Sequence, residues 1–237
     1  GTMIFIGDSS RIEDCGFENN HAEFSPWGAN YADGGAIDAI AGSNIEILKS
    51  KFTNNRTSHI GGEVHVGADL NVRVGAGEDD WVTKFIPSRA LILGCEFSDN
   101  FSPACAGGGA FAAVGNSTGV IINSLLTNNK VYYYSQGGYG GGMMFMNADF
   151  LVANNTLYNN DTKKPDAQVK PEGEGGGIRI RGAYPTILNN LINDNVSTNG
   201  LKSIDYQYTH PLTVSNCYLE EVPLYFSSYS NPETIQI

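Results

Sequence analysis

The residues best suited to chemistry lie just after pairs of glycines. Asp38 follows the first pair, and Glu63 and His65 follow the second. A carboxylate can orient an imidazole, and such groups together could supply a general base and a general acid. That chemistry would suit cleavage of a glycosidic bond or removal of a proton next to a uronate carboxylate.

Two arginines and another acid occupy equivalent places further along the chain. Arg179 and Arg181 could neutralise a substrate carboxylate bidentately, and Asp205 lies in the next copy of the pattern. Opposite charges on neighbouring strands are also a common architectural contact, worth about 0.2–1 kcal/mol. These six side chains are therefore candidates for a groove, and the architectural interpretation stays open beside the catalytic one.

A recurring glycine half-motif must position these side chains. Its copies are "GGAIDAI" (34–40), "GGEVHV" (61–66), "GGGAFAAV" (107–114), "GGGMMFM" (140–146), "GGGIRIR" (175–181) and the degenerate "KSIDYQY" (202–208). Each copy predicts a sharp turn followed by a short alternating strand. Alternation predicts an outward row of Asp38, His65, Phe111, Met144, Arg179 and Asp205, flanked by Glu63, Met146, Arg181 and Gln207.

A second half-motif alternates with the first. Its reference column holds Cys15, Ser50, Cys95, Ser124, Asn155, Asn190 and Cys217. Three residues earlier every position is Ile or Val, from Ile12 to Val214, and two residues later it is Phe, Leu or Ile, from Phe17 to Leu219. Five residues later stand Asn20, Asn55, Asn100, Asn129, Asn160 and Asn195. The unequal spacing of the copies is what loop insertions into a repeat array produce.

These columns predict an all-β fold, a right-handed parallel β-helix of about seven coils with long inserted loops. Ile, Val, Phe and Leu would fill the interior, and Asn would line a turn. We expect one domain over residues 1–237, with the repeat array at about 12–222 and a cap or tail at 223–237. Three cysteines share the reference column, so we interpret them as small buried fillers rather than a disulfide or metal site.

The pattern "I-x-x-S-x-F-x-x-N" followed by "GGAI" resembles the repeat of the chlamydial polymorphic outer-membrane proteins. It is similar also to units of bacterial, archaeal and algal β-helix surface proteins. The resemblance covers roughly Ile12 to Leu219, and departs from the pattern at Val222 and near Lys202. It implies a scaffold of the adhesin or passenger-domain type, located outside the cell or at its surface.

Aromatic residues near the outward row are candidates for binding. Phe111 and Met144 would form an apolar patch, and the insertion at 67–88 would cover it with Trp81 and Phe85. Tyr132, Tyr133 and Tyr134 lie in a second insertion. Aromatic rings beside a groove suit stacking on sugars, although these loops could equally pack on the flank of the solenoid.

Composition narrows the partners. The net charge is −11, with 14 Lys plus Arg and no basic run, which argues against nucleic acid. No apolar run approaches the roughly 20 residues of a membrane helix, so we expect no membrane insertion. We expect no cofactor and no metal, and interpret Glu78–Asp80 as a solvated turn rather than a calcium site. The isolated domain is expected to be a monomer.

Two functions remain in view. The first is an extracellular or cell-surface module for adhesion or glycan binding, without chemistry of its own and with a polysaccharide or cell-surface glycan as partner. The alternative is a carbohydrate-active enzyme, a polysaccharide lyase or glycoside hydrolase, that uses a lateral groove lined by the charged row.

Overall fold

The computed structural model describes residues 2–22, 33–58, 61–73, 81–103, 107–131, 138–162, 175–197, 200–201, 203–207, 212–219, 224–226 and 235–236. The regular elements in these ranges are all strands, which confirms the all-β prediction. No helix among these residues is long and apolar enough to cross a membrane.

Four parallel sheets make up the body of the molecule. Sheet A contains β1 (Met3–Ile6), β5 (Ile37–Ile40), β9 (Val64–Val66), β15 (Phe111–Val114), β19 (Met143–Met146), β22 (Ile178–Arg181), β27 (Ile204–Gln207) and β30 (Leu224–Phe226). Sheet B contains β2 (Ser9–Glu13), β6 (Asn44–Leu48), β12 (Arg89–Leu93), β16 (Thr118–Ile122), β20 (Asp149–Ala153), β23 (Thr186–Leu188), β28 (Leu212–Ser215) and β31 (Ile235–Gln236).

The other two parallel sheets are made of shorter strands. Sheet C contains β3 (Gly16–Glu18), β7 (Lys51–Thr53), β13 (Glu96–Ser98), β17 (Leu125–Thr127), β21 (Thr156–Tyr158), β24 (Leu191–Asn193) and β29 (Tyr218–Leu219). Sheet D contains β4 (His21–Ala22), β8 (Arg56–Thr57), β14 (Phe101–Ser102) and β18 (Lys130–Val131). The antiparallel pair β25 (Val196–Ser197) and β26 (Gly200–Leu201) follows in the C-terminal half.

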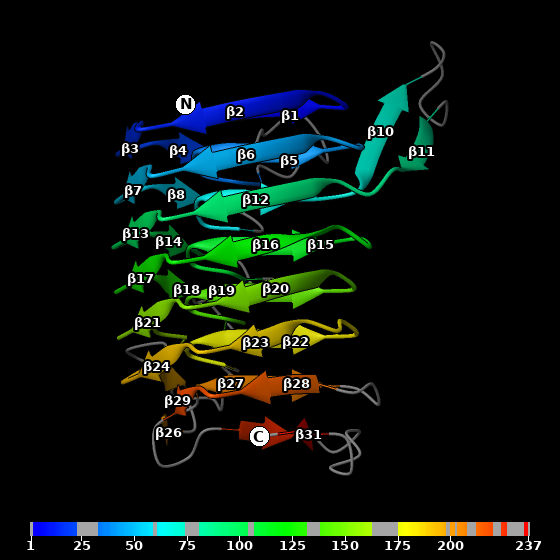
Figure 1. Cartoon of the computed structure of the whole chain (residues 1–237). Coiled ribbons are helices and arrows are strands. Elements are labelled where there is room, and N and C mark those ends of the chain that lie inside the picture. Colours follow the sequence, from blue (N-terminus) through cyan, green and yellow to red (C-terminus); the bar gives the residue numbers. More distant parts are fainter. Residues whose placement is uncertain are drawn as a thin grey trace.

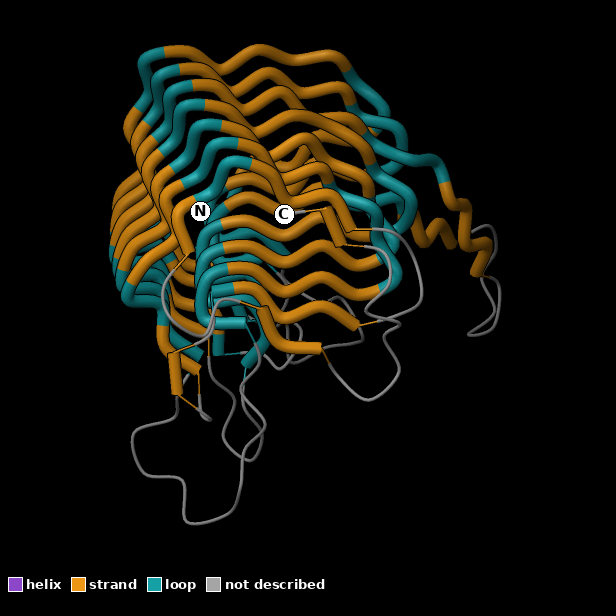
Figure 2. Tube along the Cα trace, turned by 60° about the horizontal axis from the view of Figure 1, so that its bottom comes forward, coloured by secondary structure: helices purple, strands orange, loops and turns teal. Residues whose placement is uncertain are grey.

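The chain passes through sheets A, B, C and D in turn and then starts the next coil, so like elements stack along one axis (Figure 1). Figure 2 shows strands lying over strands and turns over turns through the stack. This is the predicted parallel β-helix. Within the segment expected to cap the array, β30 and β31 continue sheets A and B.

The interior is filled by the predicted apolar columns. The Ile and Val column of sheet B is buried from Ile12 to Val214. In sheet C the rings of Phe17, Phe52 and Phe97 stack nearly parallel, with centroids 4.8 and 4.7 Å apart. These spacings equal the strand separation, because in-register parallel strands place equivalent side chains directly over one another.

The two Asn columns at the turn between sheets C and D have different tasks. The first column, which includes Asn54 and Asn128, has positive φ and supplies the left-handed turn. The second column is buried, and each side chain bonds its neighbouring coil. Asn129, for example, accepts from the backbone N–H of Asn100 and donates through Nδ2 to the carbonyl of Phe97. The ladder therefore satisfies backbone groups that the turn would otherwise leave unpaired.

A similar ladder follows the reference column between sheets B and C. The backbone N–H of Cys95 donates to Ser124 Oγ, and that of Ser124 donates to Asn155 Oδ1. The N–H of Asn190 lies 3.4 Å from Cys217 Sγ. Cys15, Cys95 and Cys217 are all free thiols. The prediction that they are buried fillers is confirmed for Cys95 alone, because Cys217 is only partly buried and Cys15, in the first coil, is exposed. Cys105 lies outside the described residues.

The glycine pair has two separate physical causes. Gly61 has φ +67°, which favours a residue without Cβ. Gly62 is required by space, since a Cβ there would lie 1.8 Å from the carbonyl oxygen of Gly109 in the next coil. The motif therefore marks the corner where the chain enters sheet A and where neighbouring coils leave no room for a Cβ.

A hairpin interrupts the stack between sheets A and B. Strands β10 (Asp69–Arg73) and β11 (Trp81–Phe85) pair antiparallel and project from the side of the solenoid (Figure 1). Phe85 at the end of β11 is 68% exposed, so the prediction that it covers an apolar patch is wrong.

Candidate functional site

The six strands of sheet A from β5 to β27 align one outward-facing side chain from each of their coils. Strand register places Asp38, His65, Ala112, Met144, Arg179 and Asp205 in this order, and we call them the outer row. Five of the six predicted members are therefore in place. Ala112 occupies the position predicted for Phe111, which changes the middle of the row.

Phe111 belongs to the core, so its predicted outward orientation is wrong. It pairs in register with Val64 and Met143, is 1% exposed, and packs against Phe145 and Phe150. The reason is the third glycine in "GGGAF". The positive-φ glycine of this coil is Gly108, so Gly107 precedes the motif and counting from it shifts the strand by one residue.

Asp38 and His65 form the expected cross-coil pair. Asp38 Oδ1 lies 2.7 Å from His65 Nδ1, and the side chains are 13% and 4% exposed. A carboxylate on Nδ1 fixes the ring orientation and leaves Nε2 as the nitrogen that would exchange a proton with a substrate. Nε2 is itself buried, so a substrate could reach it only if the residues around it moved. The geometry of an oriented imidazole is present, and its catalytic role stays a prediction.

The other end of the outer row is a closed network of charged and polar groups. Arg179 donates to Asp205 Oδ1 from Nη1 and to Gln207 Oε1 from Nη2, while its guanidinium lies 5.3 Å from the ring centroid of Tyr139. Arg179 and Asp205 are 4% and 0% exposed. These contacts use the two terminal guanidinium nitrogens of Arg179 that a substrate carboxylate would need for bidentate binding. They therefore favour the architectural interpretation of the pair formed by Arg179 and Asp205. Arg181 is exposed.

The middle of the outer row is apolar and covered. Ala112, Val114 and Met144 are buried as a second small cluster, with Tyr139 and Met146 packed against them. Tyr139 thus contributes to both the apolar cluster and the environment of Arg179. The row is not an open groove of convergent polar groups at these positions.

Glu63 is inside the solenoid, so the prediction that it flanks the outward row is wrong. Its side chain is 0% exposed, and neither carboxyl oxygen has a hydrogen-bond partner of standard geometry. Burial raises the pKa of Glu63 well above its ordinary value, and the nearby Asn55 amide lowers it only in part. Strand alternation fails here because the chain bends after the glycine pair: the N–H groups of Ala36 and Ile37 both donate to the Glu63 carbonyl.

The remaining predicted binding residues cannot be placed at the outer row. Tyr132, Tyr133 and Tyr134 lie outside the described residues. Trp81 begins strand β11 of the projecting hairpin, and its side chain is likewise outside the description. The acidic stretch 78–80 is also undescribed, and no group of three or more metal-ligating side chains occurs in the part of the chain that the structure covers.

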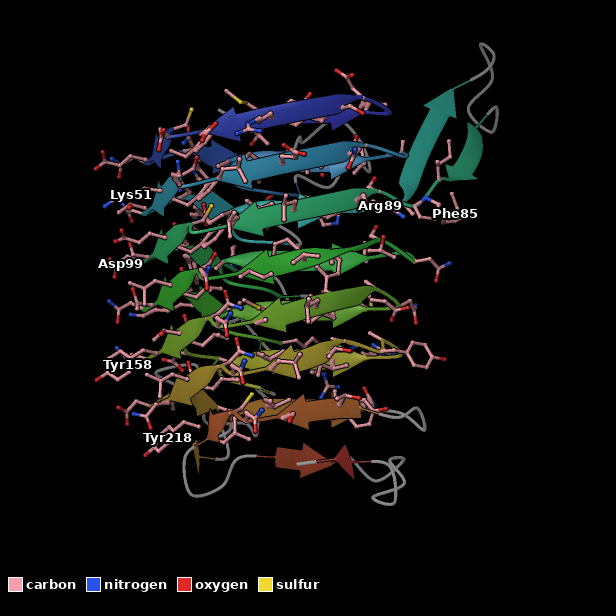
Figure 3. All side chains as sticks on the ribbon, in the orientation of Figure 1. Lys51, Phe85, Arg89, Asp99, Tyr158 and Tyr218 are labelled. Atoms are coloured by element: carbon pink, nitrogen blue, oxygen red, sulfur yellow. The ribbon has the colours of Figure 1, made fainter. Side chains whose placement is uncertain are left out.

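Sheet C carries an exposed surface that the sequence analysis missed. Strands β17, β21, β24 and β29 each contribute one exposed large apolar side chain, and together these form what we call the sheet C face: Leu125 (38%), Tyr158 (45%), Leu191 (42%) and Tyr218 (62%). Figure 3 shows Tyr158 and Tyr218 projecting from the same side of the stack. Large apolar groups gathered on an otherwise polar surface are typical of binding sites.

The sheet C face is uncharged and has amide borders. None of its four strands contains a charged residue, whereas the preceding strands carry Glu18 and the ion pair of Lys51 with Glu96. Exposed asparagines with positive φ line the edge toward sheet B: Asn123, Asn154, Asn189 and Asn216. The opposite edge carries Asn128 and Asn159, and ends in the acid Asp194.

The alignment of the repeat held the signal for this face. Positions one and three after the reference column alternate with the buried Phe or Leu and must therefore face outward. Reading those two columns gives Gly16, Lys51, Glu96, Leu125, Thr156, Leu191 and Tyr218, and Glu18, Thr53, Ser98, Thr127, Tyr158 and Asn193. The change from charged to apolar halfway along the stack is visible in the sequence alone.

The sequence of the chain was compared with models of protein families, with curated proteins and with solved structures. The family model described as a right handed beta helix region matches residues 83–235, which is more than half of the chain. Neither the comparison with curated proteins nor the comparison with solved structures gave a match.

Proposed function

Because the chain belongs to the right-handed β-helix family, we propose that it is a glycan-binding module of an extracellular or cell-surface protein, and that the sheet C face is its binding surface. The surface location follows the resemblance of the repeat to surface-protein repeats and is part of the proposal. The single observation that carries the proposal is the uncharged face with Tyr158 and Tyr218, on a chain whose net charge is −11.

The chemistry of the face suits sugars. The faces of pyranose rings present C–H groups that pack on tyrosine rings, while the phenol hydroxyl remains available for a hydrogen bond. Exposed amides at the border can both donate to and accept from sugar hydroxyls. The strands and ladders beneath hold the backbone in place, so binding would order few groups besides the side chains themselves.

Replacing Tyr158 and Tyr218 together with alanine is expected to weaken glycan binding by at least about tenfold, since aromatic side chains dominate the energy of such contacts. The measurement is depletion of the protein by insoluble neutral polysaccharides. The matched control is Tyr184→Ala, because Tyr184 is also 45% exposed but lies between sheets A and B. Equal binding by all three proteins would remove the sheet C face from the proposal.

A second function is favoured by one observation, the 2.7 Å contact between Asp38 and His65. If this pair transfers protons in a lyase or hydrolase, soluble products or unsaturated uronate will appear when the protein is incubated with polysaccharides. His65→Ala and Asp38→Asn would then abolish the activity while binding to the sheet C face persists. Arg89→Ala, at an exposed position of β12 on sheet B, serves as the control variant. Absence of products from neutral and acidic polysaccharides would rule this function out for those substrates.

A further inference from the structure

The arrangement of contacts on the sheet C face is elongated along the solenoid axis. Its four strands are only two or three residues long, so the face is about 10 Å wide at most along a strand. Across the strands, three steps of about 4.8 Å separate β17 from β29, which gives a track of about 14 Å. A ligand that touches all four apolar side chains must therefore run across the strands.

The apolar contacts recur once per coil along this track. Leu125, Leu191 and Tyr218 stand in one column together with Thr156, and Tyr158 lies beside the column two residues further along its strand. Each step of about 4.8 Å along the axis therefore supplies one large side chain. An extended chain of β-1,4-linked pyranoses lengthens by a similar amount per ring, whereas an α-1,4-linked chain coils and cannot follow a straight track.

The charges on and beside the sheet C face indicate which extended glycans it can bind. The four strands contain no Lys or Arg that could pair with a uronate, and the acid on the border, Asp194, would repel one. The asparagine borders carry no charge and match hydroxyl groups. The ligand that complements the face is therefore a neutral chain.

We propose, resting on the proposed function, that the sheet C face binds a neutral, extended, β-linked polysaccharide that lies along the solenoid axis with one sugar ring on each of the strands β17, β21, β24 and β29. Tyr158 and Tyr218 contact rings two coils apart, and the asparagines of the border bond the hydroxyl groups of the same rings. Four consecutive rings fill the surface.

Calorimetric titration with cello-oligosaccharides of two to six rings tests this register. We expect the affinity to rise roughly three- to tenfold with each ring up to four and then to level off. Maltotetraose, with the same composition and α linkages, should bind at least about tenfold more weakly, as should the β-linked acidic tetramannuronate. Asn159→Ala at the border should weaken cellotetraose binding, whereas Asn19→Ala, in the equivalent exposed turn of the first coil, should not.

The outcomes separate this inference from the proposed function. Equal affinities for cellotetraose and maltotetraose, a preference for tetramannuronate, or a gain that continues past four rings would overturn the axial register while leaving glycan binding intact. No binding of any oligosaccharide would overturn both. A second copy of the chain could also occupy the sheet C face, and sedimentation of the protein without sugar tests for it. If the protein is a dimer and the substitutions Tyr158→Ala and Tyr218→Ala dissociate it, the face is a dimer interface, and both proposals are overturned.

Discussion

Replacing Asn129 with alanine is expected to lower the free energy of unfolding by about 2–5 kcal/mol, because buried polar groups that lose their partners each cost about 1–3 kcal/mol. Asn129 is 0% exposed. Its Oδ1 accepts from the backbone N–H and the side-chain amide of Asn100, and its Nδ2 donates to Phe97 O and Asn160 Oδ1. Alanine removes these four contacts and leaves the N–H of Asn100 buried without an acceptor.

Urea unfolding followed by circular dichroism measures this loss. The matched control is Asn128→Gly, since Asn128 sits one residue earlier on the surface with φ +58°, a conformation that glycine adopts without strain. We expect the control to change the stability by less than about 1 kcal/mol. If both variants lost the same amount, the ladder would not be the element that stabilises the stack.

The second large effect concerns the pH dependence of stability, which Glu63→Gln is expected to change. The folded state raises the pKa of Glu63 above its ordinary value of 4.5, so the folded protein holds this proton more tightly than the unfolded chain does. The resulting stabilisation is fully present below about pH 4.5 and is lost as the pH rises toward the folded-state pKa. In this window the wild-type protein should lose up to about 1.4 kcal/mol per pH unit relative to Glu63→Gln.

Denaturant unfolding at a series of pH values from 4 to 9 measures the difference in the free energy of unfolding between the wild type and Glu63→Gln. Glu18→Gln, at an exposed position of β3, is the control and should track the wild-type curve. At neutral pH Glu63→Gln should be more stable than the wild type, because the uncharged amide of Gln costs less to bury than the charged carboxylate of Glu63. A difference between wild type and Glu63→Gln that stays constant with pH would mean that Glu63 does not keep its proton in the folded state.

The fold was predictable because stacked coils require the same kind of residue at the same place. The β-branched column of sheet B, the Phe and Leu column of sheet C and the Asn ladder all appear in the sequence as residues at fixed offsets. The glycine pair was predictable as a turn, but its second member reflects close packing of neighbouring coils, which only the three-dimensional structure reveals.

The site was predictable where strands are regular and not where they bend. Asp38 and His65 meet as expected because β5 and β9 are in register. Phe111 was misplaced because an extra glycine, Gly107, moved the apparent start of its strand. Glu63 was misplaced because alternation holds within a strand and fails at the corner before it. Residues in inserted loops, such as Tyr132 to Tyr134, follow no column, so the repeat says nothing about where they lie.

The sheet C face was overlooked for a different reason. Charged residues are the usual signal for chemistry, while the exposed columns of sheet C contain leucine, threonine and tyrosine in the strands β17, β21, β24 and β29. Their outward direction follows from alternation with Leu126, Leu157 and Ile192, which are buried. These exposed residues lie close together because their coils are neighbours in the stack. The alignment of the repeats already gives the order of the coils.

Backbone amide spectra of isotope-labelled protein, recorded during a titration with cellotetraose, test the central claim most directly. We expect shifts that saturate together and concentrate on β17, β21, β24 and β29 and on the bordering turns at Asn154 and Asn189, with sheet A unchanged. Shifts concentrated around Asp38 and His65 would instead place the site on the outer row, and spectra that do not change would contradict glycan binding by this face.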